Sequence, residues 1–136
     1  MTKGPLLLFA EDDHEDWFLI QDYFNSFGSP NKLERVLNGV EMLERLRDPS
    51  KEEPDLVLLD LKMPLKGGVE TLQEIKSDAD LKHIPVIVLT SSSSPSDILD
   101  CYENGVNAFM TKPVDKESLR ALRDYWFKYV KLPKLL

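Results

Sequence analysis

Acidic side chains stand at the ends of two apolar segments of this sequence. Asp60 ends the run that begins at Leu56, and Glu11 and Asp12 directly follow the apolar run 6–10. A carboxylate at the end of a buried strand is costly to keep charged unless a partner neutralises it. Because ligands bind outside the carboxyl ends of the strands in an open α/β sheet, Asp60 is a candidate reactive group.

A hydroxyl and an ammonium follow two further apolar segments. Thr90 ends the segment 85–90, and Lys112 follows the short segment at about 107–111. Clustered carboxylates repel each other and require a cation, and oxygen ligands of this kind suit Mg²⁺. A lysine and a threonine beside the metal can hold phosphoryl oxygens. The set predicts that Asp60 is a nucleophile that forms an aspartyl phosphate, with Mg²⁺ as the cofactor.

The elements that must position these side chains alternate between strand and helix. Strands are expected at 6–10, about 33–37, 55–60, 85–90 and about 107–111. The helices between them are marked by helical spacing, caps and breakers: Trp17, Ile20, Phe24 and Phe27 before Gly28; about 39–48; Gly67-Gly68 before Val69, Leu72 and Ile75; Ser94-Pro95 to Gly105; and Asp115 before Leu119, Leu122, Trp126 and Tyr129. Five such units predict an α/β fold, a doubly wound five-stranded parallel sheet with five helices on its two faces.

Composition excludes several classes of function. The 136 residues suffice for one domain, and the net charge of −7 argues against direct binding of nucleic acid. Cys101 is the single cysteine, so no internal disulfide can form, and a reducing compartment fits. The apolar run near the N-terminus is too short for a signal peptide or a membrane span. We therefore expect a cytoplasmic protein with no membrane partner.

These motifs together resemble the receiver domain of bacterial two-component response regulators. The matching residues are Glu11-Asp12, Asp60 with Met63-Pro64, Gly68, Thr90-Ser91, Phe109 and Lys112-Pro113. The resemblance implies a flavodoxin-like fold with strand order 2-1-3-4-5. It also implies a single receiver domain over 1–136, with its core at about 5–130 and a loose tail at 131–136. Since no output domain follows, the chain is similar to single-domain response regulators, and the pattern at 62–68 is similar to the phytochrome-associated subgroup.

The resemblance also implies roles at the metal site. Asp60 would be the phosphoacceptor, Asp12 a direct Mg²⁺ ligand and Glu11 a ligand through water. The backbone carbonyl of Lys62 would complete the protein's share of the metal shell. The long basic side chain of Lys62 departs from the usual pattern, so we expect it to reach the phosphoryl group or hinder the attacking water, which would change the lifetime of the phosphorylated state.

Further roles concern the response to phosphorylation. Thr90 and Lys112 would each bond a phosphoryl oxygen, and Phe109 matches the aromatic switch position. The expected function is a phosphorylation-dependent switch rather than a turnover enzyme. A sensor histidine kinase, of the phytochrome type if the subgroup holds, would be the phosphodonor. The face formed by the fourth helix, fifth strand and fifth helix would relay the signal to a downstream protein partner.

Other interpretations of the same residues stay open at this point. Asp60 could be a strand-end cap, Thr90 a β-branched strand residue and Lys112 a solvated loop lysine. A phosphatase would want an acid two residues after the nucleophile, where Lys62 stands, and a pseudo-receiver would lack part of the acidic set. Asp13 is expected only to cap the first helix.

Four aromatic residues crowd the end of the last predicted helix: Tyr125, Trp126, Phe127 and Tyr129. One apolar stripe of a helix cannot contain all four, so some must face outward. Aromatic side chains are enriched at protein interfaces. We therefore expect a homodimer through this aromatic C-terminal helix, with partial burial of amphipathic rings as the alternative.

Overall fold

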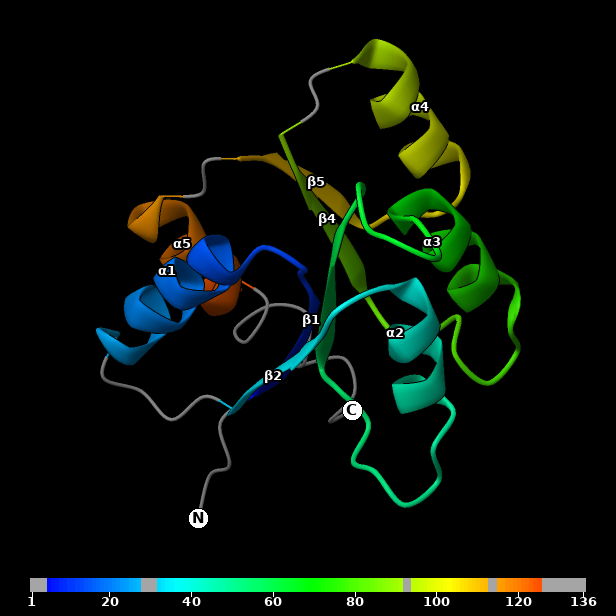
Figure 1. Ribbon diagram of the computed structural model, residues 1–136, viewed down its shortest axis with the longest axis horizontal. Helices are drawn as coiled ribbons and strands as arrows, with labels where there is room; N and C mark the ends of the chain where they lie inside the picture. The colour runs from blue at the N-terminus through cyan, green and yellow to red at the C-terminus, as the bar shows by residue number, and fades with distance from the viewer. Residues whose placement is uncertain (1–4, 28–31, 92–93, 113–114, 126–136) are drawn as a thin grey trace.

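The chain folds around one five-stranded parallel sheet in the computed structural model, which describes residues 5–27, 32–91, 94–112 and 115–125 (Figure 1). The strands are β1 (Leu6–Ala10), β2 (Lys32–Val36), β3 (Leu56–Asp60), β4 (Val86–Thr90) and β5 (Ala108–Thr111). Their order is β2-β1-β3-β4-β5, and every neighbouring pair is parallel. The predicted fold class and strand order are confirmed.

Helices cover both faces of the sheet. They are α1 (His14–Asn25), α2 (Gly39–Leu46), α3 (Gly68–Ser77), α4 (Pro95–Glu103) and α5 (Lys116–Tyr125). Figure 1 shows α1 and α5 together on one face, with α2, α3 and α4 on the other. This two-sided cover explains why β1 and β4 are buried at every position and have continuous apolar sequences.

Alternating residues of β1 serve two separate cores. Leu7 and Phe9 pack with α1 and α5, in a cluster that includes Ile20 and Leu119. Leu8 and Ala10 point the opposite way, into a cluster that includes residues of α2, α3 and α4. Because successive strand side chains alternate between faces, these two cores fix the register of β1 and the position of the residue that follows it.

Local hydrogen bonds accompany two of the differences between expected and observed element ends. β3 begins at Leu56 because the Asp55 carboxylate accepts a hydrogen bond from the Leu6 N–H at 2.9 Å. α2 stops at Leu46, two residues earlier than expected, and the Asp48 carboxylate accepts from the Ser50 N–H in the turn beyond. The second strand lies one residue earlier than expected.

The caps of α1 and α4 were predicted with different success. The Asp13 carboxylate accepts from the Asp16 N–H at 3.0 Å, which confirms Asp13 as the N-cap of α1. Ser94 is the N-cap residue of α4, but its side chain makes no capping hydrogen bond there. Gly105 follows α4 with φ of +88°, a conformation that favours glycine.

Two predictions fall outside the described residues. The loose tail at 131–136 is one, and the aromatic interface is the other, since it rests on side chains at positions 125–129. Within the described part of the chain, no helix has the length and apolar composition needed to cross a membrane.

Candidate functional site

Three carboxylates meet at the carboxyl edge of the sheet. β1 and β3 are neighbours, and Ala10 is paired with Leu59. The next residue of each segment, Glu11 or Asp60, therefore lies at the same level at this edge of the sheet. One carboxylate oxygen from each of Glu11, Asp12 and Asp60 lies within 4.8 Å of the other two. Such an all-oxygen cluster matches the ligands that hard divalent cations prefer. The predicted convergence of these three residues is confirmed.

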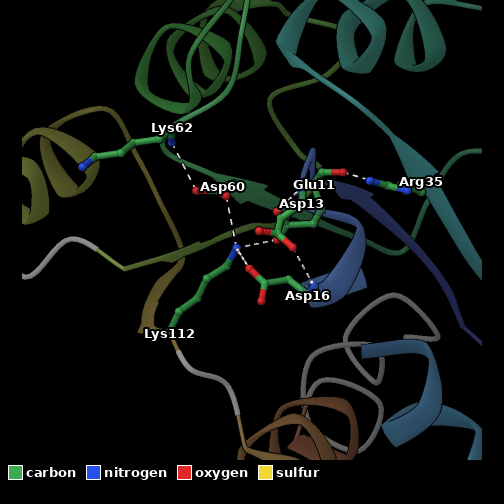
Figure 2. A network of polar contacts seen from close by, with 7 residues as sticks. All are labelled: Glu11, Asp13, Asp16, Arg35, Asp60, Lys62 and Lys112. Carbon is green, nitrogen blue, oxygen red and sulfur yellow. Dashed lines mark hydrogen bonds and ion pairs between the residues drawn. The ribbon is translucent and has the colours of Figure 1, made fainter. Parts of the chain in front are cut away.

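The Lys112 ammonium lies at the centre of the site and joins three carboxylates (Figure 2). It donates to Glu11 Oε1 at 2.5 Å, Asp16 Oδ2 at 2.9 Å and Asp60 Oδ2 at 3.1 Å. A lysine ammonium carries three hydrogens, so every donor is used. The interpretation of Lys112 as a solvated loop residue is wrong, because its side chain is only 11% exposed.

Burial sets the protonation of this cluster. Burial raises the pKa of Glu11 from 4.5 to about 7, although the hydrogen bond and charge of Lys112 act in the opposite direction. Burial alone would lower the pKa of Lys112, but its hydrogen bonds to Glu11 and Asp16 outweigh burial and raise it. Lys112 therefore stays a cation. One ammonium cannot neutralise the carboxylates of Glu11, Asp12, Asp16 and Asp60 together, so the cluster can accept a divalent cation.

Asp60 presents its carboxylate at the mouth of the site. Oδ1 accepts a hydrogen bond from the Lys62 N–H at 3.1 Å, while Oδ2 accepts from Lys112. Figure 2 shows the Lys62 side chain extending away from Asp60, and this residue is exposed. The expectation that the Lys62 ammonium reaches the reacting group therefore finds no support in this conformation. The backbone of Lys62, by contrast, is part of the site.

An open pocket of about 590 Å³ lies over these groups. Its lining consists of Asp12, Asp13, Asp16, Asp60, Lys62, Ser91 and Lys112. The lining combines four aspartates, two lysines and one serine, which suits a cation together with a small tetrahedral anion more than an apolar ligand. Of the carboxylates that line this pocket, that of Asp60 belongs to the last residue of a strand, β3.

Thr90 lies on β4, the neighbour of β3, and Phe109 lies on β5, the strand beyond β4. Leu89 pairs with Asp60, so Thr90 lies one residue beyond the Asp60 level on β4, and it is fully buried. The Lys112 N–H donates to the Thr90 carbonyl at 2.7 Å, which ties the lysine's backbone to β4. Phe109 pairs with Val88 and is partly buried against the core on the α2–α4 face.

The loop between β3 and α3 is held close to Asp60 by its glycines and by a tight turn. The Gly68 N–H donates to the Leu61 carbonyl at 3.0 Å, and a Cβ on Gly68 would lie 2.5 Å from the Asp60 carbonyl oxygen. The Lys66 N–H donates to the Pro64 carbonyl at 2.8 Å around Leu65, whose φ is +66°. This is a γ-turn with positive φ at its centre, a strained form for leucine.

Two residues of the site were missed by sequence reasoning. Asp16 binds Lys112, and its place in the first turn of α1, the helix that directly follows the acidic residues after β1, was the available signal. Arg35 on β2 donates through Nε to the Glu11 carbonyl oxygen at 2.7 Å, and its Nη1 lies 3.0 Å from His14 Nδ1. Nothing in the sequence around Arg35 indicates this contact, because it depends on the pairing of β1 with β2.

Comparison with known proteins gives consistent matches. Residues 7–123 match the response regulator receiver domain family. The response regulator Rcp1 of Synechocystis sp. (strain ATCC 27184 / PCC 6803 / Kazusa) is 34% identical over 136 residues, covering 94% of this chain and 92% of Rcp1. The Mn²⁺-bound crystal structure of Rcp1 superimposes with a TM-score of 0.84 at 30% identity, covering 93% and 96%. The phosphorylated cyanobacterial phytochrome response regulator RcpA also gives a TM-score of 0.84, at 34% identity and with 92% and 95% covered.

Proposed function

Since this chain belongs to the response regulator receiver domain family, we propose that it is a phosphorylation-dependent signalling switch with Asp60 as its phosphoacceptor. A receiver domain accepts a phosphoryl group on an aspartate from a histidine kinase, and it is a phosphoacceptor rather than a turnover enzyme. The finer statement, that Asp60 is the aspartate, is carried by one observation. Among the aspartates that the structure describes, Asp60 is the one that combines a place at a strand end, membership of the acidic cluster and a hydrogen bond from the Lys112 ammonium.

The chemical step needs little from the protein beyond position and charge. A carboxylate oxygen of Asp60 forms a bond to phosphorus while the bond from phosphorus to the donor's histidine nitrogen breaks. The imidazole takes a proton from solvent and leaves neutral, and the phosphoryl group keeps its negative charges. Lys112, already 3.1 Å from Asp60 Oδ2, is placed to donate to a phosphoryl oxygen.

The acidic cluster fits a divalent cation. We assign Mg²⁺ to it, with Asp12 and Asp60 as direct ligands, Glu11 acting through water and the Lys62 carbonyl as the remaining protein ligand. The three carboxylate oxygens within 4.8 Å support this assignment. When bound, the ion neutralises charge on the phosphoryl oxygens. The relative Rcp1 binds Mn²⁺ in its crystal structure, which is consistent with such a site.

The structural change caused by phosphorylation would pass from Thr90 on β4 to β5, the strand beyond it. We assign to Thr90 a hydrogen bond to the phosphoryl group, because it ends β4 one residue beyond the Asp60 level. Phe109, half-buried on β5, would then adjust its packing and alter the face made by α4, β5 and α5. A downstream protein partner would recognise this face.

Partners follow from the family and its relatives. A sensor histidine kinase is the phosphodonor, and the match to the phytochrome response regulator RcpA supports a phytochrome-type photoreceptor as that kinase. A homodimer through the aromatic side chains at positions 125–129 stays a prediction. Sedimentation of the wild type tests it, and a monomer at every concentration and phosphorylation state would contradict it.

The phosphoacceptor is tested by intact mass. Purified protein with Mg²⁺ and acetyl phosphate should gain one phosphoryl group, and Asp60→Asn should gain none. Asp13→Asn is the matched control, because asparagine keeps the N-cap of α1 while removing a carboxylate from the same pocket. An adduct that persists in Asp60→Asn would contradict the assignment. Multiple turnover of varied phosphoesters would favour a hydrolase, and no adduct with any donor would favour a pseudo-receiver.

A further inference from the structure

We propose that Asp16 is a positioning residue that competes with the phosphoryl group for the Lys112 ammonium and so weakens the phosphorylated state. The inference rests on the proposed function, because the phosphoryl group in question is the one on Asp60. It concerns a residue on α1, outside the acidic cluster that binds the cation. The juxtaposition that carries it is the 2.9 Å contact between Asp16 Oδ2 and Lys112 Nζ, across 96 residues of sequence.

The first step is the saturation of Lys112. Its three ammonium hydrogens are directed to three carboxylates, those of Glu11, Asp16 and Asp60. A phosphoryl oxygen has no free donor to accept from. Any bond between Lys112 and the phosphoryl group must therefore replace one of the three existing bonds.

The second step identifies the bond that is exchanged. Phosphorylation converts the Asp60 carboxylate into an acyl phosphate, so the Lys112 hydrogen that Asp60 accepts can turn to the phosphoryl group, and the bonds that still hold the ammonium back are those to Glu11 and Asp16. The Glu11 side chain is 3% exposed, whereas that of Asp16 is 42% exposed. A buried carboxylate that loses its partner is left without water, while a half-exposed carboxylate is rehydrated. Asp16 is thus the partner that Lys112 can release at the least expense of free energy.

The third step concerns the geometry of Asp16. Its backbone is fixed in the first turn of α1, where its N–H donates to Asp13 Oδ1 at 3.0 Å. The next residue, Trp17, packs edge-on against Phe9 with ring centroids 5.3 Å apart. Because α1 is anchored on both sides of Asp16, the carboxylate stays at the pocket mouth and keeps competing after the exchange.

The test uses beryllofluoride, a phosphoryl mimic that binds an aspartate carboxylate, titrated calorimetrically at saturating Mg²⁺. Asp16→Asn should tighten its binding about threefold, within the range of a partly exposed ion pair. Glu15→Gln is the matched control. Glu15 is exposed in the same turn of α1, and the substitution removes the same charge at a position outside the pocket. Glu15→Gln should bind as the wild type does. Equal affinity for Asp16→Asn and Glu15→Gln, or weaker binding by Asp16→Asn, would overturn the inference.

A second measurement separates competition from a structural role. In a Lys112→Met background, adding Asp16→Asn should not change beryllofluoride affinity, whereas a structural effect of Asp16 would persist there. Asp16→Glu should restore wild-type affinity. If Asp16→Asn fails to fold, Asp16→Ser, which removes the same charge, takes its place. Wild-type protein that binds no beryllofluoride would overturn the proposed function itself, while wild-type binding without an Asp16 effect would overturn only this inference.

Discussion

The Gly39 N–H donates to the Lys66 carbonyl oxygen over 3.2 Å, so the first residue of α2 touches the loop that follows Asp60. At Gly39 the start of α2 and this loop lie too close together to admit any side chain. A Cβ on Gly39 would lie 2.0 Å from Thr71 Oγ1 and 2.7 Å from the Lys66 carbonyl oxygen. α2 thereby helps to hold the loop that carries Lys62, although α2 contributes no side chain to the pocket lining.

Gly39→Ala should destabilise the protein by about 2 kcal/mol or more, because backbone must move to admit the methyl group. Helix propensity alone would give the opposite sign, since alanine favours a helix by about 1 kcal/mol over glycine. Chemical denaturation measures the difference. Gly67→Ala is the control, because its Cβ would meet only the Leu61 carbonyl oxygen, at 3.4 Å. Equal stability of the two variants would contradict the prediction.

Lys62→Met should change the lifetime of the phosphorylated state by less than about twofold, because the ammonium points away from Asp60 and solvent screens it. Lys112→Met should reduce phosphorylation by acetyl phosphate about tenfold or more, because it removes the only ammonium bonded to Asp60 among the described residues. The decay of the adduct mass after removal of the donor gives the lifetime. A large effect of Lys62→Met would restore the original expectation that this side chain reaches the phosphoryl group.

The stability of the metal-free protein should depend on pH through Glu11. Its pKa is about 7 in the fold and 4.5 as its ordinary value, so the folded state binds more protons than the unfolded state between these values. The free energy of unfolding should therefore fall as pH rises through this window, by on the order of 2–3 kcal/mol.

Denaturation of Glu11→Gln beside the wild type isolates this effect, because glutamine cannot titrate. The difference between the two proteins should follow the window, and saturating Mg²⁺ should reduce it, since a cation stabilises the ionised carboxylate. Parallel pH profiles of the two metal-free proteins would refute the role of Glu11.

Leu65→Asn should stabilise the protein by about 0.5–1 kcal/mol. Leu65 has φ of +66° at the centre of the γ-turn and is 83% exposed, so its side chain loses little packing when replaced. Asparagine adopts positive φ with less strain than leucine does. Thermal unfolding measures the shift, and Leu99→Asn is the control, because Leu99 is 57% exposed on α4 without positive φ. A loss of stability in Leu65→Asn equal to that of Leu99→Asn would show that the turn is not strained.

Periodicity and strand-end chemistry predicted the elements and the acidic site because both depend on local pattern. The continuous apolar run of β1 reflects helices on both faces, and Asp60 stands out because it breaks such a run. The predicted ends of the elements were less accurate where a side chain accepts the hydrogen bond that a backbone carbonyl would otherwise accept. Asp55, for instance, bonds the Leu6 N–H and lies before the start of β3 rather than within it.

Contacts across the sheet could not be predicted in the same way. Arg35 reaches the Glu11 carbonyl only because β2 pairs with β1 in one register, and a basic residue in an edge strand has many possible partners. The direction of the Lys62 side chain was likewise undetermined by its position in sequence. Asp16 differs, because its place in the first turn of α1 was visible, but its partner Lys112 is 96 residues away in the sequence.

The Lys112 contact to Glu11 spans 101 residues, and its contact to Asp60 spans 52. Contacts of such large sequence separation form late, because closing long loops opposes them until the rest of the fold is in place. During synthesis, the chain would present Asp60 well before Lys112 leaves the ribosome. Competence to accept a phosphoryl group would then appear only with the last strand, so a nascent or partly folded molecule could not compete with the finished protein for the kinase.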